Sequence, residues 1–190
     1  MAGVLFGVAY ILLAIRESPW CWPLGIGNAA LFLVVFAQAR IYSNAALQAV
    51  YVVVSFYGWY SWLHGGRDHG RLLVSRAPGR WLISLAATAA IASVTLGFFL
   101  KLRTDAALPF TDATTTAFSL AAQWMATRKW LENWLVWIGV DVVYVAMYAS
   151  QGLYPTAGLY AAFLVLASLG YREWGASMRA EGATAGVAAP

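Results

Sequence analysis

Long apolar runs without charge alternate with short polar segments along this chain. Residues 18–39, 41–66 and 81–100 contain no Asp, Glu, Lys or Arg. A helix needs about 20 apolar residues to cross a bilayer core of roughly 30 Å. Continuous rather than alternating runs also favour helices over a transmembrane barrel. We therefore predict an all-α membrane protein with seven spans, at residues 2–16, 20–38, 43–63, 80–100, 111–127, 132–149 and 154–174.

The amino-acid composition supports this fold class. Hydrophobic residues make up 62% of the chain and charged residues 11%, whereas a soluble domain carries about 25% charged residues. So little polar surface is left that lipid must cover much of the exterior. A cleaved signal peptide is the alternative for the short first span, but Met1-Ala2-Gly3 lacks the basic start that such a peptide needs.

Basic residues are distributed unevenly among the predicted loops. Nine of the 12 Lys and Arg residues follow spans 1, 3, 5 and 7, and three follow spans 2 and 4. The positive-inside rule then places the N-terminus outside and the C-terminus in the cytoplasm. This bias also explains the net charge of +4, so the charge is no argument for a nucleic-acid partner.

The chain contains an internal repeat. Residues 22–62 align without gaps on residues 134–174, and eleven of the 41 aligned positions are identical. The identical pairs include Trp22 and Trp134, Gly27 and Gly139, Gly58 and Gly170, and Trp62 and Trp174. Composition bias would match Ala and Val by chance, but not Trp at both ends with Gly between them. Spans 2 and 3 therefore correspond to spans 6 and 7, and by extension span 1 to span 5.

This repeat predicts two parallel three-helix bundles joined by a linker helix, a three-plus-one-plus-three arrangement. We expect the first bundle at residues 1–63 and the second at 105–174. Residues 64–104 form a basic cytoplasmic loop and the linker helix, and residues 175–190 a disordered cytoplasmic tail. Parallel repeats related by an axis along the membrane normal are typical of transporters with a substrate site between the repeats.

Asp141 is the only carboxylate predicted deep inside a span. Its unpaired burial would cost at least about 2.5–3.5 kcal/mol, which makes it a functional candidate. Aromatic residues spaced by three or four surround it, within an arc of about 80° on span 6: Trp130, Trp134, Trp137, Tyr144 and Tyr148. Such stripes often serve packing alone, but a stripe with a central carboxylate suits a flat organic cation, through cation–π attraction and a counter-charge.

Span 3 has a similar polar and aromatic face, and buried amides occur on spans 2 and 5. Each amide by itself is more typical of contacts between helices, but together they could orient a ligand in an apolar pocket. At the start of span 6, Glu132-Asn133 is explained by charge compensation at a helix N-terminus. The candidate substrate-binding residues are Asn28, Gln48, Tyr51, Ser55, Trp59, Gln123, Asn133, Trp134, Trp137, Asp141 and Tyr144.

The sequence argues against catalysis and against a light receptor. His64 and His69 have no Cys or Glu partner at the spacing of metal ligands, and the motifs of serine hydrolases and phosphate-binding loops are missing. We expect no cofactor and no metal. A retinal protein needs a buried lysine, but Lys101 and Lys129 both fall in loops. A seven-helix receptor or a membrane enzyme or assembly subunit stays open as an alternative.

Three motifs resemble the PnuC family of bacterial vitamin transporters, best known for nicotinamide riboside. The resemblance covers residues 4–174, and Thr127-Arg128-Lys129 precedes the second motif as in that family. The motifs are Gln48 with Tyr57-Gly58-Trp59-Tyr60 and Trp62 in span 3, Glu132-Asn133-Trp134-Leu135 with Trp137 at span 6, and Gln151-Gly152-Leu153-Tyr154 at the last turn.

The resemblance implies a fold like that of the SWEET sugar transporters in the bacterial cytoplasmic membrane. It also implies facilitated diffusion without an ion or ATP, a homotrimer, and trapping of the vitamin by a cytoplasmic kinase. Members that carry nicotinamide riboside have Asn at the positions of Asp141 and Ser55. Thiamine, another aromatic cation carried by a sister branch, is therefore the first alternative substrate.

Overall fold

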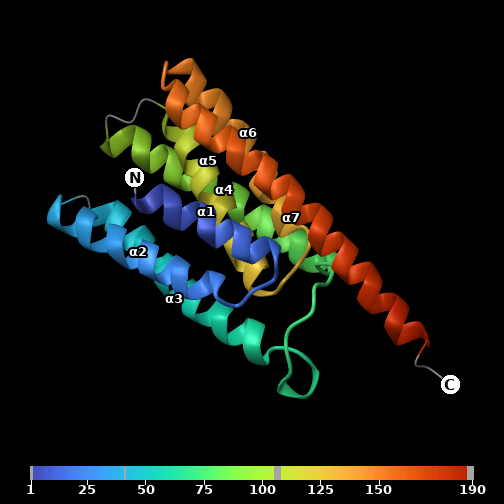
Figure 1. Cartoon of the computed structure of the whole chain (residues 1–190). Coiled ribbons are helices and arrows are strands. Elements are labelled where there is room, and N and C mark those ends of the chain that lie inside the picture. The colour runs from blue at the N-terminus through green and yellow to red at the C-terminus, as the bar shows by residue number, and fades with distance from the viewer. Residues whose placement is uncertain (1, 41, 105–107, 188–190) are drawn as a thin grey trace. The chain divides into compact units, whose positions relative to one another are not determined.

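The computed structural model describes residues 2–40, 42–104 and 108–187, which form seven α-helices and one short 3-10 turn, η1 (Arg67–His69). Figure 1 shows the helices in chain order. Their bounds are α1 (Ala2–Ile15), α2 (Cys21–Gln38), α3 (Tyr42–His64), α4 (Gly79–Arg103), α5 (Pro109–Thr127), α6 (Asn133–Ser150) and α7 (Tyr154–Val187). The all-α class predicted from the apolar runs is therefore confirmed.

The first six helices begin and end close to the predicted spans, but α7 is longer than its span. We expected a disordered tail from residue 175, whereas α7 continues as a helix to Val187. The tail is rich in Ala, with Met, Arg and Glu, and these are strong helix formers, which explains the extension. Residues 188–190 lie outside the described residues. So do Met1 and residues 105–107, where the two predicted bundles begin.

The helices differ in how well they suit the interior of a membrane. By length and hydropathy, α2, α4, α6 and the part of α7 up to Ala183 can each span a bilayer, and α1 contains the shorter apolar stretch Leu5–Ile15. Helices α3 and α5 carry polar side chains among their apolar residues. Those on α3 include Gln48 and Ser55, and those on α5 include four Thr residues before Ser119. These two helices therefore provide most of the polar groups within the spans.

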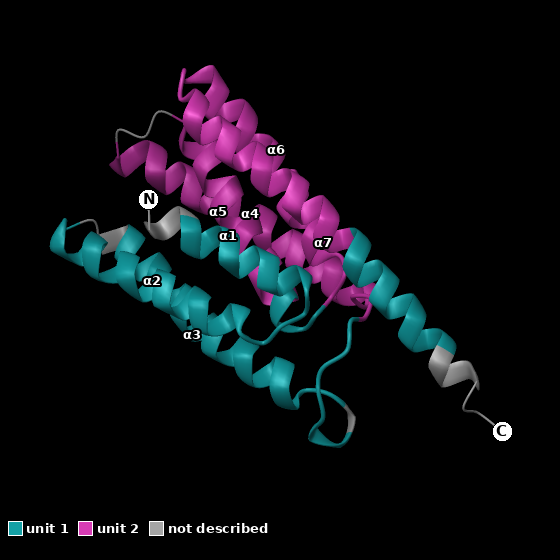
Figure 2. Ribbon diagram, in the orientation of Figure 1, with its two compact units in different colours: residues 1–74, 126–129, 172–190 teal, residues 75–125, 130–171 magenta. Residues whose placement is uncertain are grey.

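The chain forms two compact units, shown in Figure 2. Unit 1 contains residues 1–74, 126–129 and 172–190, and unit 2 contains residues 75–125 and 130–171. In unit 1, α2 packs against both α1 and α3. In unit 2, α4 meets the start of α5, where the rings of Phe98 and Phe110 lie edge to face with centroids 5.2 Å apart. The two predicted bundles and their axis along the membrane normal stay a prediction.

Both units contain the same contact between a tryptophan and a glycine at repeat-equivalent positions. In unit 1, a Cβ atom added to Gly58 would lie 2.6 Å from Cζ2 of Trp22. In unit 2, a Cβ atom added to Gly170 would lie 2.6 Å from Cζ2 of Trp134. Real Cβ atoms do not approach a ring so closely. The second and third helices of each repeat therefore pack together by placing an indole ring on a bare backbone.

Replacing Gly58 or Gly170 by alanine should lower the free energy of unfolding by about 1–3 kcal/mol, because the new methyl group overlaps an indole ring. Gly27 and Gly139 are matched controls, since they are also repeat-equivalent and an added Cβ would meet nothing within 4 Å. Alanine at these two positions should be neutral or slightly stabilising. Thermal unfolding of the four variants in detergent measures the difference. Equal unfolding temperatures for both pairs would contradict the proposed packing.

Candidate functional site

Asp141 is buried in the middle of α6 in unit 2. Only 5% of its surface is exposed. Among the described residues no ion pair involves this carboxylate, because the Lys and Arg side chains that form ion pairs contact Glu17 and Glu132 instead. An unpaired intramembrane carboxylate is energetically expensive, which makes Asp141 a candidate for binding an ion or a ligand. The predicted burial of Asp141 is therefore confirmed.

Three tyrosine rings form a stack beside Asp141. Tyr144 and Tyr148 come from α6, and Tyr160 comes from α7. The centroids of Tyr144 and Tyr160 lie 4.5 Å apart, those of Tyr148 and Tyr160 lie 5.3 Å apart with ring planes at 14°, and the two α6 tyrosines are also stacked. The charge of Asp141 acts on the Tyr160 phenol. Electron-rich ring faces and a carboxylate therefore occupy one region of unit 2, an arrangement that attracts organic cations.

A buried polar stripe on α5 lies against this stack. Thr115, Ser119 and Gln123 are all buried and follow one another at intervals of four residues. The Tyr144 hydroxyl hydrogen bonds with the Thr115 and Ser119 side chains, which joins the stripe to the tyrosines. Of the stripe, the sequence analysis selected only Gln123. The interval of four was visible in the sequence, whereas the arrival of Tyr160 beside α6 depends on how α7 packs.

The candidates on α2 and α3 lie in unit 1. Ser55 is buried, and Gln48, Tyr51 and Trp59 on the same helix are half-buried. Ser55 approaches α2 near Gly25, where an added Cβ would lie 3.8 Å from Ser55 Oγ. One turn further along α2, Asn28 Oδ1 is buried and has no hydrogen-bond partner among the described residues. Unit 1 thus offers an unused acceptor within its polar interior.

Two candidates have structural contacts that explain their burial without a ligand. Asn133 Nδ2 donates a 2.6 Å hydrogen bond to the Trp130 carbonyl oxygen at the start of α6. Trp134 covers the bare backbone of Gly170. Trp137, which follows on the same face of α6, is half-buried. The structure therefore places Asp141 and Tyr144 near polar groups that the sequence analysis did not select, with Gln123 further along α5. It gives Asn133 and Trp134 structural contacts.

Replacing Asn28 by leucine, which has a similar volume, should leave the free energy of unfolding unchanged or raise it by about 1 kcal/mol, because it removes a buried oxygen without a partner. Gln123→Leu is the matched control: this buried amide does have an interaction partner and should lose stability by about 1–3 kcal/mol. Thermal unfolding without ligand compares them. A clear stability loss in Asn28→Leu would show that its oxygen is satisfied.

Known transporters are similar to this chain along most of its length. The nicotinamide riboside transporter PnuC of Escherichia coli is 27% identical over 96% of this chain and 87% of its own length. The riboflavin/roseoflavin transporter RibM of Streptomyces davaonensis is also 27% identical, over 92% of this chain and 83% of its own. The crystal structure of the vitamin B3 transporter PnuC matches the fold with a TM-score of 0.68 and 19% identity, covering 93% and 80% of the two chains.

These matches confirm the resemblance that the motifs of α3 and α6 predicted. They identify a multi-pass membrane transporter rather than an enzyme. The model of the nicotinamide mononucleotide transporter family matches residues 1–176. The chain therefore belongs to the nicotinamide mononucleotide transporter family.

Proposed function

We propose that this protein carries nicotinamide riboside across the bacterial cytoplasmic membrane by facilitated diffusion. The observation that carries the proposal is the buried Asp141, which lacks an ion-pair partner among the described residues and lies beside three stacked tyrosines. Nicotinamide riboside is a flat pyridinium cation attached to a ribose. Its ring matches an aromatic and anionic environment, and its hydroxyl groups match the Thr and Ser side chains of α5.

Net uptake requires a further step, because facilitated diffusion only equalises concentrations on the two sides of the membrane. We propose that a cytoplasmic kinase phosphorylates the vitamin, and the added negative charge is incompatible with a site built around Asp141.

The distribution of basic residues supports an N-terminus outside and a C-terminus in the cytoplasm. The family resemblance supports a homotrimer. In this scheme the carrier itself uses neither an ion gradient nor ATP, and only the kinase consumes ATP.

Riboflavin is the second candidate substrate, because a riboflavin/roseoflavin transporter is among the relatives. Its ring is neutral, so Asp141 would serve it through hydrogen bonds only. Thiamine is an aromatic cation like nicotinamide riboside and fits the same charge argument. The role of the Asp141 charge therefore separates riboflavin from the two cations, and direct titration separates the cations from each other.

Asp141→Asn should weaken binding of a cationic vitamin by about 5- to 30-fold while leaving the fold intact. A charge–charge attraction of roughly 2–4 kcal/mol at about 4–6 Å is partly offset by the cost of desolvating the carboxylate, which leaves about 1–2 kcal/mol. The purified variant is titrated with nicotinamide riboside, thiamine and riboflavin. Asp68→Asn is the control, since Asp68 is exposed and its positive φ of 52° suits Asn.

The outcomes of this titration separate the explanations. Unchanged affinity for both cations would exclude a counter-ion role for Asp141. Equal binding of riboflavin by both forms of the protein, with no binding of the cations, would assign the chain to flavin transport. A lower unfolding temperature without a selective loss of affinity would make Asp141 a structural residue.

Uptake should also be independent of proton and sodium gradients. A carrier coupled to protons or sodium commonly uses an intramembrane acid to bind its ion, but the environment of Asp141 is aromatic and suits an organic cation. Proteoliposomes loaded with a suitable kinase and ATP are compared with and without an uncoupler. Strong inhibition by the uncoupler, with the kinase still active, would contradict facilitated diffusion.

A further inference from the structure

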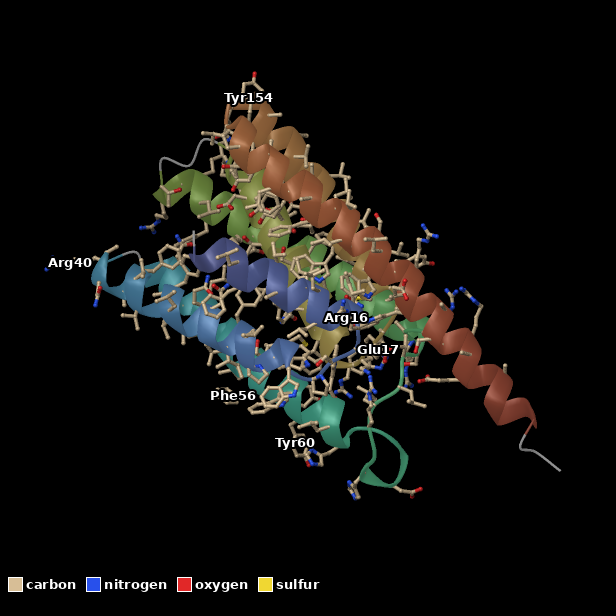
Figure 3. All side chains as sticks on the ribbon, viewed as in Figure 1. Arg16, Glu17, Arg40, Phe56, Tyr60 and Tyr154 are labelled. Atoms are coloured by element: carbon tan, nitrogen blue, oxygen red, sulfur yellow. The ribbon has the colours of Figure 1, made fainter. Side chains whose placement is uncertain are left out.

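Two residues of opposite charge meet at equivalent positions of the internal repeat. Lys129 Nζ donates a 2.8 Å hydrogen bond to Glu17 Oε2, and the two residues are 112 positions apart, which is the offset of the repeat. Glu17 follows α1 (Figure 3) and Lys129 follows α5, the two corresponding helices. Both adopt a left-handed backbone, with φ of 53° and 49°. The Lys129 side chain is 0% exposed and that of Glu17 is 11% exposed.

Two tryptophans link the same corresponding helices in a reciprocal way. Trp62 Nε1 on α3 donates a 2.9 Å hydrogen bond to the Ala126 carbonyl oxygen on α5. Its repeat partner Trp174 on α7 donates a 3.0 Å hydrogen bond to the Ala14 carbonyl oxygen on α1. The third helix of each repeat thus binds the first helix of the other repeat. The two indole rings also contact each other, with centroids 5.7 Å apart.

We call this group of six residues the clasp: Ala14, Glu17, Trp62, Ala126, Lys129 and Trp174. All six lie in unit 1. Lys129 Nζ also lies 4.7 Å from the centroid of the Trp62 ring, so the ion pair and the tryptophans form one cluster. Every bond of the clasp joins residues of different repeats. A movement of one repeat against the other at this end of the protein must therefore break the clasp.

Charges and burial act against each other in the ion pair. Burial acts to raise the pKa of Glu17, but hydrogen bonds from Lys129 and Ser177 and the charges of Lys129 and Arg71 outweigh it, and the pKa is lowered. Burial lowers the pKa of Lys129, and Glu17 offsets only part of this effect. Each partner therefore depends on the other to carry its charge while buried.

We propose that the clasp is the gate at the end of the protein that carries the predicted cytoplasmic loops, and that it is closed in this structure. The proposal rests on the transport function proposed above. Loss of the attraction between buried charges is largely offset when water solvates both ions. The Glu17–Lys129 pair can therefore separate and close repeatedly at low cost, unlike an apolar contact. A contact that never opens would gain no stability from buried charges over well-packed apolar residues.

Cys21 is a natural reporter for the opening of this gate. It is the single cysteine of the chain, its side chain is fully buried, and it precedes Trp22, whose ring meets the clasp residue Trp62 at 5.4 Å. A hydrophilic thiol reagent can reach it only when this region opens. The labelling rate of purified protein in detergent is measured without any vitamin, so the test does not depend on which substrate the protein carries.

Glu17→Gln leaves Lys129 buried without a counter-charge, so it should favour the open gate and accelerate Cys21 labelling about 10-fold or more. Arg76→Gln is the matched control. Arg76 forms an ion pair of 3.5 Å with Glu132 in unit 2, but its side chain is 66% exposed, and its removal should not change the labelling rate. Wild-type labelling of a folded Glu17→Gln variant would overturn the proposal.

The double variant Glu17→Gln, Lys129→Met keeps the test decisive if the single variant does not fold. It removes both charges, so the closed clasp should be at least as stable as in the wild type, but the open state no longer gains hydration of two ions. Cys21 labelling should be no faster than in the wild type, and vitamin uptake into proteoliposomes should be about 10-fold slower with unchanged binding affinity. Wild-type uptake by this variant would show that the clasp is a static tie and would also overturn the proposal.

Discussion

The packing of an indole ring on a bare glycine backbone sets the geometry on which the rest of this structure depends. The contact occurs once in each repeat, with Trp22 on Gly58 and Trp134 on Gly170. A helix that carries no Cβ at this point leaves room for the indole ring of the neighbouring helix to lie directly on its backbone. In a membrane, where apolar side chains gain nothing from leaving lipid, van der Waals packing of this kind is a main source of stability between helices.

The sequence predicted most of the fold because the bilayer imposes simple rules. Apolar runs of sufficient length must be helical, so the first six helices agree with the predicted spans. The rule does not apply beyond the membrane, and there the prediction failed: the segment after residue 175 is helical because of its Ala-rich composition. Helix α7 therefore continues beyond the point that hydrophobicity defines.

For the candidate site, the sequence could place residues along one helix but could not predict the contacts between helices. Helical spacing placed Asp141 and Tyr144 on one face, but Tyr160 reaches them from α7. The ion pair of the clasp was missed for a different reason. Glu17 and Lys129 precede the aligned segments, and a comparison that scores identity ignores a position where one repeat carries a negative charge and the other a positive one. Equivalent positions that form an ion pair must carry opposite charges, so they cannot be identical, whereas Trp62 and Trp174 touch as identical residues.

The opposite charges at Glu17 and Lys129 have a consequence for the ancestry of this chain. Two identical half-length subunits would present either two carboxylates or two ammonium groups at this point, and such a pair would repel in a buried setting. A homodimeric ancestor could not have carried opposite charges at these two equivalent positions, so the present pair arose only after the two halves could mutate independently. Duplication followed by fusion thus permitted a salt bridge that no symmetric assembly of one gene product could form.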